Sequence, residues 1–291
     1  MAAQVAEAVK LSSGHHMPTI GLGVYRSAPG SETYDAVLSA LRLGYRHIDT
    51  AQLYGNEADV GRAVRDSGVP REQVFVTSKL WRDSYGTESG LAAVRASVER
   101  SGLGWLDLML LHSPSADPGR REAAWRALEA AVQQVVCGAV WCGVGGNLVR
   151  SIGVSNFGEA HLEKLMRGAT VQPAVNQVEV HPFLQRRELV AYCRQRGIVV
   201  EAYSPLSKGS KLADPRVTSV AERLGVTPAQ VLLRWSLQHG LVPLPKSTHP
   251  QRQAANLDVR SFELSAGDMA VLDGCEEGLV TGWDPISQDP V

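Results

Sequence analysis

Four ionisable side chains of four chemical types stand at or shortly after the ends of short apolar segments that predict strands. They are Asp49, Tyr54, Lys79 and His112. In a barrel of alternating strands and helices, catalytic residues lie at the carboxyl ends of the strands. A carboxylate, a phenol, an ammonium group and an imidazole gathered there could deliver a proton and stabilise a developing negative charge.

The elements that must position these residues alternate along the chain. The predicted strands are residues 20–25, 46–49, 74–79, 106–112, 151–155, 174–180, 199–204 and 241–246. Helical apolar spacing covers residues 31–43, 57–66, 87–101, 121–136, 158–167, 186–196, 214–224 and 228–238. This alternation implies parallel βαβ units. In a chain of 291 residues it predicts an α/β fold, a (β/α)₈ TIM barrel forming a single domain over residues 1–291. The segment KLSSGHHMP, residues 10–18, is expected to form a hairpin that plugs the barrel floor.

A doubly wound sheet is the rival architecture, and it needs a glycine-rich phosphate turn between a strand and a helix. GLG at 21–23 lacks the third glycine, and CGVGGN at 142–147 precedes a strand instead of opening a helix. Both are interpreted as bends. No Walker A sequence is present.

An apolar, glycine-rich insert at 135–147 departs from the alternation. It joins a helix to the next strand, so it is expected on the face opposite the active site. It could extend the helix, pack beneath the barrel or form a contact patch, and a translated intron is also conceivable. Since it carries no acidic, basic or histidine side chain, we expect a structural or self-association role that leaves catalysis unaffected.

The composition excludes several classes of function. A net charge of −1 offers no general attraction to nucleic acid or to an anionic membrane. No apolar run reaches membrane-spanning length, and the first residues lack the pattern of a signal peptide, so a cytoplasmic protein is expected. The four cysteines show no C-x-x-C spacing and no HExxH sequence occurs, which predicts reduced thiols and no metal site. A monomer is expected, with any weak self-association made through the insert.

The chain resembles the aldo-keto reductases from Leu11 to its C-terminus, apart from the insert. GYRHIDTAQLYGNEADVG at 44–61 matches the family's first signature position by position. SIGVSNF, NQVEVHP, AYSPL and LPKS match later signatures in the same order. The resemblance implies a (β/α)₈ barrel that reduces small-molecule aldehydes and ketones to alcohols.

The resemblance also assigns a catalytic tetrad of Asp49, Tyr54, Lys79 and His112. Tyr54 would donate the proton, and Lys79 would lower the pKa of its phenol. Asp49 would keep Lys79 charged and oriented. His112 would place the substrate oxygen near the phenol.

Cofactor residues follow from the same resemblance. Ser155, Asn156 and Gln177 should hold the nicotinamide carboxamide, and Tyr203 should stack on its ring. Lys246, Ser247 and Arg252 supply two cations and a hydroxyl for an adenosine 2′-phosphate, which favours NADPH over NADH. The family's glutamate before Asn256 is replaced by Ala255, so a polar contact to the adenosine is expected to be missing. The expected cofactor-binding set is Ser155, Asn156, Gln177, Tyr203, Ser204, Leu206, Lys246, Ser247, Arg252 and Asn256.

The substrate pocket is expected to involve Tyr25, Trp81 and Ser113. Ser113 stands where many relatives have tryptophan, which predicts a more open or polar pocket. The leading hypothesis is an NADPH-dependent carbonyl reductase. A non-enzymatic cofactor-binding regulatory subunit and an NAD-linked alcohol dehydrogenase remain as alternatives.

Overall fold

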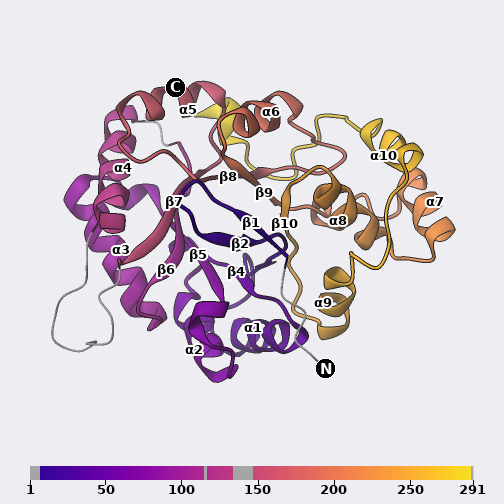
Figure 1. The fold of residues 1–291 in the computed structure, drawn as a ribbon, viewed down its shortest axis with the longest axis horizontal. Coiled ribbons are helices and arrows are strands. Elements are labelled where there is room, and N and C mark those ends of the chain that lie inside the picture. Colours follow the sequence, from indigo (N-terminus) through magenta and orange to yellow (C-terminus); the bar gives the residue numbers. More distant parts are fainter. Residues whose placement is uncertain (1–6, 115–116, 134–146, 290) are drawn as a thin grey trace.

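The protein is a barrel of eight parallel strands, seen here in a computed structural model that describes residues 7–114, 117–133, 147–289 and 291. The strands are hydrogen-bonded in chain order, with helices on the outside (Figure 1). This confirms the predicted (β/α)₈ fold. The strands are β3 (Leu22–Gly23), β4 (His47–Asp49), β5 (Phe75–Leu80), β6 (Leu106–Leu111), β7 (Val149–Ser155), β8 (Val175–Glu179), β9 (Val199–Tyr203) and β10 (Val242–Leu244).

The barrel closes where β3 meets β10. Gly21 donates its N–H to the carbonyl of Pro243 at 3.1 Å, and Gly23 donates to that of Pro245 at 3.0 Å. A Cβ atom on Gly21 would lie 2.7 Å from the Leu244 side chain. The GLG segment was interpreted as a bend, but Gly21 is instead required for close approach of the two strands. Residues 142–146 of the second glycine-rich segment lie outside the described residues.

The eight predicted helices agree with the observed ranges to within three residues, apart from residues 134–136 of the predicted helix 121–136, which lie outside the described residues. The observed helices are α1 (Ser31–Leu43), α2 (Glu57–Asp66), α3 (Thr87–Ser101), α4 (Pro118–Gln133), α5 (Glu159–Gly168), α6 (Arg187–Gln195), α7 (Pro215–Leu224), α8 (Pro228–Gln238), α9 (Pro250–Leu257), α10 (Ala266–Asp273) and α11 (Pro285–Gln288). Both α7 and α8 lie between β9 and β10, so the helix that follows β10 is α9, which was not predicted. It is short and buries only Gln253 and Asn256, so it lacks the apolar stripe that periodicity detects.

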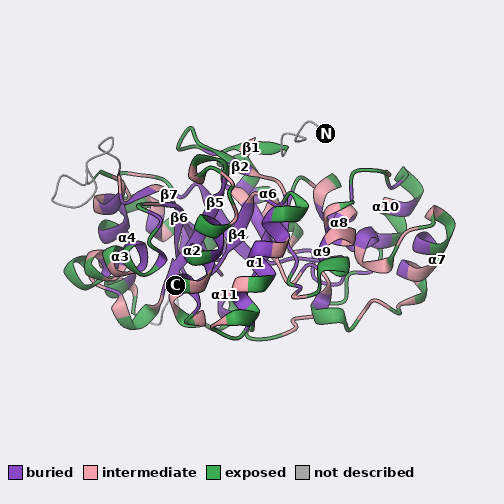
Figure 2. Cartoon of the chain, turned by 90° about the horizontal axis from the view of Figure 1, so that it is seen from below, coloured by how far each residue is buried: buried purple, intermediate pink, exposed green. Residues whose placement is uncertain are grey.

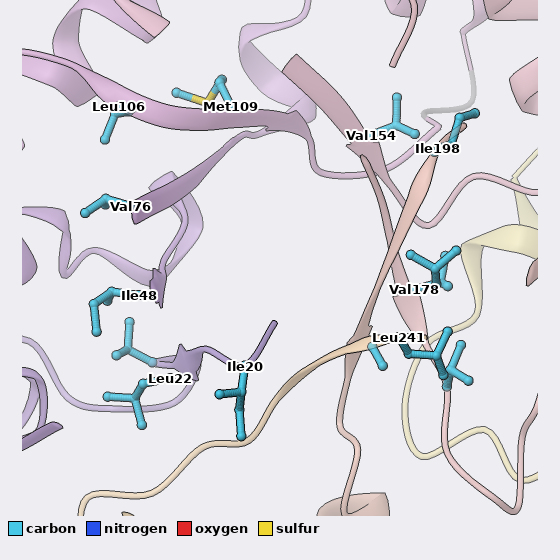
Figure 3. Packing of buried hydrophobic residues seen from close by; sticks show 14 of the residues in the cluster. Ile20, Leu22, Ile48, Val76, Leu106, Met109, Val154, Val178, Ile198 and Leu241 are labelled. Carbon is cyan, nitrogen blue, oxygen red and sulfur yellow. The ribbon is translucent and has the colours of Figure 1, made fainter. Parts of the chain in front are cut away.

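Two apolar clusters hold the barrel together. The larger lies between the strands and the surrounding helices and includes Ile48, Val76, Val154 and Val178 (Figure 3). The burial pattern agrees with this position of the core: the strands at the centre are buried, while the outer faces of the helices are exposed (Figure 2). Neighbouring residues of a strand point to opposite faces. Packing of Ile48 on the helices therefore directs Asp49 into the barrel.

The second cluster fills the barrel floor beneath a two-stranded hairpin. Strands β1 (Ala8–Lys10) and β2 (His16–Pro18) pair antiparallel, and the hairpin lies across one end of the barrel (Figures 1 and 2). Leu11 and Met17 from it are buried in a cluster with Leu110 and Val242 of the barrel. The predicted plug is confirmed.

The segment predicted as an insert, residues 135–147, lies outside the described residues except for Asn147. Among the described residues, no helix combines the length and apolar character needed to cross a membrane. Within the same residues, no cluster of three or more His, Cys, Asp or Glu side chains could hold a metal ion.

Candidate active site

The four predicted catalytic residues meet at the carboxyl ends of β4, β5 and β6. Asp49 is the last residue of β4, Lys79 lies one residue before the end of β5, and His112 directly follows β6. Tyr54 closes a 3₁₀ turn, Gln52–Tyr54, that ends at Gly55 with φ 68°. Because parallel strands end on the same side of the sheet, residues from three crossover units come together there.

A buried ion pair forms the base of this group. Lys79 Nζ lies 2.6 and 2.8 Å from the two carboxylate oxygens of Asp49 and donates to the carbonyl of Thr50 at 2.9 Å. Lys79 is fully buried. A buried ammonium is tolerated when it is paired and its hydrogens are bonded, as they are here. The same Nζ lies 3.4 Å from Tyr54 Oη, so one cation joins the carboxylate to the phenol.

The burial of Tyr54 opposes the predicted lowering of its pKa. Burial raises the pKa of the phenol well above its ordinary value, and the Asp49 carboxylate adds to this rise. Lys79 was expected to lower it, but its charge is already balanced by both oxygens of Asp49. Desolvation of the phenolate therefore outweighs the attraction of the ammonium. Tyr54 accordingly keeps its proton throughout the neutral range.

His112 completes the group as a neutral imidazole. Burial and the neighbouring Lys79 charge lower the pKa of His112 well below its usual value. Its ring stands edge-on to Tyr54, with ring centres 5.7 Å apart, and edge-on to Trp81 at 5.2 Å. Its Nδ1 is buried and has no hydrogen-bond partner among the described residues. The ring can therefore offer one N–H to a substrate oxygen.

A cavity of about 920 Å³ opens over these residues, and every predicted cofactor-binding residue lines it. Asp49, Tyr54 and His112 contribute to its wall, whereas Lys79 lies behind it. The predicted cofactor residues in the wall are Ser155, Asn156, Gln177, Tyr203, Ser204, Leu206, Lys246, Ser247, Arg252 and Asn256. This volume is ample for an elongated organic ligand.

Asn156 is held by hydrogen bonds on both sides of its amide. Its Nδ2 donates to the carbonyl of His112 at 3.0 Å and to Ser155 Oγ at 3.1 Å. Its Oδ1 accepts from the hydroxyl of Tyr203 at 2.9 Å. The N-cap of α5 is Gly158, so Asn156 does not cap that helix. Its backbone is left-handed, with φ 65°, and the residue lines the cavity beside the other predicted cofactor residues.

Cationic side chains mark another part of the same cavity. Lys246 and Arg252 are exposed, and neither forms an ion pair within the described part of the chain. Between them, Pro250 begins α9, whose first backbone N–H groups have no helical partner. Two unpaired cations beside a helix N-terminus suit the binding of a phosphate group.

The substrate pocket was predicted only in part. Tyr25 and Trp81 line the cavity, but Ser113 does not. Ser113 is fully buried, and its carbonyl and N–H both bond to the hydroxyl of Tyr85, at 2.7 and 3.3 Å. Within residues 106–114, His112 is thus the last residue that lines the cavity.

Several apolar lining residues were missed by the sequence analysis, among them Leu53 and Trp283. Leu53 and Trp283 are unusually exposed for their size, at 51% and 41%, and both line the cavity. The Arg82 guanidinium lies 5.1 Å from the ring centre of Trp81 and 6.0 Å from that of Trp283. No local motif marks Trp283, because only the return of the C-terminal segment brings it to the site.

A (β/α)₈ barrel that gathers a phenol, a buried ammonium and an imidazole beside a long cavity defines the class as a barrel oxidoreductase. The sequence model of the aldo/keto reductase family matches residues 19–277, and the chain belongs to that family. Its members are NAD(P)-dependent oxidoreductases that use NADP(H).

Several known proteins are similar to this chain over almost the whole length of both sequences. An aldo-keto reductase of Mycolicibacterium smegmatis is 44% identical over 277 residues, covering 95% of this chain and 96% of that one. The glyoxal reductase of Bacillus subtilis is 42% identical over 285 residues, 98% of each chain. The crystal structure of a Gox0644 mutant in complex with NADPH has a TM-score of 0.88 at 39% identity, covering 98% of this chain and 99% of that chain.

Proposed function

We propose that the protein reduces aldehydes and ketones to alcohols, with NADPH as hydride donor and Tyr54 as proton donor. One observation carries the proposal. Tyr54, held 3.4 Å from the buried Lys79, shares a single cavity with Lys246 and Arg252, two cations that form no ion pair with any residue the structure describes. A proton donor for the substrate and a phosphate-binding group for the cofactor thus lie in one cavity, where both molecules can meet.

The residues of the cavity fit NADPH. Asn156 and Gln177 present amide groups that suit the carboxamide, and the ring of Tyr203 offers a face on which the nicotinamide can stack. Lys246 and Arg252 would bind the 2′-phosphate through charge-assisted hydrogen bonds, because neither is engaged by a carboxylate among the described residues. This preference for the phosphate favours NADPH over NADH.

The tetrad then acts on the substrate oxygen. When bound, NADPH supplies the hydride that adds to the carbonyl carbon. His112 donates its N–H to the carbonyl oxygen and orients it, while Tyr54 transfers its phenolic proton to that oxygen. The raised pKa of Tyr54 is compatible with this step, because a developing alkoxide is a much stronger base than a phenolate. Lys79 stabilises the phenolate that remains, and Asp49 holds Lys79 in place.

The test is a spectrophotometric assay of cofactor oxidation with a panel of carbonyl compounds. The panel contains an aromatic aldehyde, an aliphatic ketone, a small sugar and a dicarbonyl, since one relative is a glyoxal reductase. We expect oxidation of NADPH with at least one aldehyde, and slower oxidation of NADH at equal concentration. If NADPH binds but no carbonyl compound oxidises it, the regulatory-subunit alternative is favoured instead.

A further inference from the structure

One buried acidic group beneath the active site has no part in the reaction as described. Glu201, on β9, is fully buried and stands directly opposite Gln177 in the parallel register of β8 and β9. Both side chains point into the barrel, where Gln177 also reaches Asp49 of β4. A buried carboxyl group in this position calls for an explanation, because its burial is costly.

Asp49 and Glu201 together accept both hydrogens of the Gln177 side-chain amide. Gln177 Nε2 donates to Asp49 Oδ2 at 2.8 Å and to Glu201 Oε2 at 2.7 Å. An amide nitrogen carries two hydrogens, so both are used. Gln177 also lines the cavity. The group that it offers there is therefore its oxygen Oε1, which is an acceptor only.

We propose that Glu201 is a positioning residue: with Asp49, it holds the Gln177 amide so that Oε1 accepts from the carboxamide NH₂ of the nicotinamide. The inference rests on the proposed function, since it concerns the cofactor of the same site. Asp49 alone would fix which amide atom faces the barrel interior, and Glu201 adds the second bond that stops the amide from rotating. A fixed acceptor binds more tightly than a mobile one, because less freedom is lost on binding.

The protonation of Glu201 agrees with this role. Burial, together with the Asp49 carboxylate, raises the pKa of Glu201 to about 8. The titratable groups that face it are Asp49 and His47 from β4 and Lys79 from β5. Its second oxygen, Oε1, has no hydrogen bond among the described residues and lies 3.5 Å from His47 Nε2. A proton on Oε1 would face that nitrogen and leave Oε2 as the acceptor for Gln177.

The test compares two cofactors that differ only in the group that Gln177 would contact. NADP⁺ carries the carboxamide, whereas its 3-acetylpyridine analogue has a methyl group in place of the NH₂. Binding is followed by quenching of tryptophan fluorescence, because Trp81 and Trp283 line the cavity. Glu201→Met removes the acceptor at similar size. It should weaken NADP⁺ by about fivefold, the loss of roughly one hydrogen bond. It should change binding of the analogue less than twofold.

Glu201→Gln keeps an acceptor for Gln177 and should bind NADP⁺ within about twofold of the wild type. Glu129→Met is the matched control. Glu129 is a buried carboxyl group on α4 that accepts from the N–H groups of Thr170 and Val171 at 2.6 and 2.9 Å. Its loss should lower the melting temperature without changing the ratio of the two affinities.

Equal weakening of NADP⁺ and the analogue by Glu201→Met would show a merely structural role and overturn the inference. So would unchanged NADP⁺ binding in that variant, or a loss in Glu201→Gln as large as in Glu201→Met. If Glu201→Met does not fold, Glu201→Leu takes its place under the same criteria. A wild-type protein that binds neither cofactor would instead contradict the proposed function, so the two failures are distinguishable.

Discussion

At the scale of residues, the site depends on one buried cation and its neighbours. Lys79 is paired with Asp49, touches the phenol of Tyr54 and depresses the pKa of His112. This charge adds to the effect of burial on the imidazole and, in the proposed mechanism, stabilises the phenolate left after proton transfer. Because that charge is buried, salt in the solvent screens it little.

The phosphate preference is tested by Arg252→Ala. A charge-assisted hydrogen bond contributes about 1.5–3 kcal/mol, so loss of Arg252 should weaken NADPH by about tenfold or more. NADH has no 2′-phosphate and should bind almost unchanged. The control is Arg62→Ala, which removes an exposed arginine of α2 that does not line the cavity. Titration of both cofactors into each variant measures this, and equal losses for NADPH and NADH would exclude Arg252 as the 2′-phosphate contact.

Site residues that lie within continuous sequence motifs could be predicted from the sequence. Site residues that reach the cavity from distant segments of the chain could not. The motifs that contain Asp49 and Asn156 mark positions at strand ends, and the structure places both in the cavity wall. The raised pKa of Tyr54 and the position of Trp283 could not be predicted in this way. The first depends on desolvation in the assembled site, and the second on packing between distant segments.

At the scale of elements, closure of the barrel depends on the absence of a side chain. Strand β3 approaches β10 so closely that a Cβ atom on Gly21 would lie 2.7 Å from Leu244 and 2.8 Å from the His47 ring. The eight strands could be predicted from their apolar runs, but this role of glycine could not, because it depends on the neighbouring strand. The helix α9 was missed for a related reason, since its buried residues are polar.

Gly21→Ala should therefore destabilise the protein. Overpacking a buried position costs about 1–3 kcal/mol. Gly168→Ala is the control, because this glycine lies at the end of α5 and a Cβ atom on it would meet no neighbouring element within 4 Å. Urea unfolding of the two variants should show a loss of stability for Gly21→Ala alone. Similar urea midpoints for the two variants would mean that the junction of β3 and β10 accommodates the added methyl group without loss of stability.

At the scale of the whole molecule, Glu201 couples stability to pH. The pKa of Glu201 is about 8 in the folded protein and 4.5 as the reference for the unfolded chain. Between these values the folded state binds more protons than the unfolded state, so this group's contribution to stability is lost as pH rises towards 8. Glu201→Gln removes the titration.

The melting temperature of Glu201→Gln, relative to the wild type, should therefore rise between pH 5 and pH 8 and level off above it. The comparison cancels the contributions of titratable groups that do not contact Glu201. Thermal unfolding of both proteins at a series of pH values measures this. A difference that stays constant over the range would show that Glu201 does not titrate in it.

The central claim is that Tyr54 delivers the proton for carbonyl reduction, at the part of the cavity where the nicotinamide is proposed to bind. The most direct measurement is the rate of NADPH oxidation by Tyr54→Phe at saturating aldehyde, together with its affinity for NADPH. General acid catalysis contributes about 10²- to 10⁴-fold, so turnover should fall at least a hundredfold. The affinity for NADPH should stay within about twofold, because the phenol acts on the substrate and not on the cofactor. Turnover within tenfold of the wild type, at full NADPH occupancy, would contradict the account.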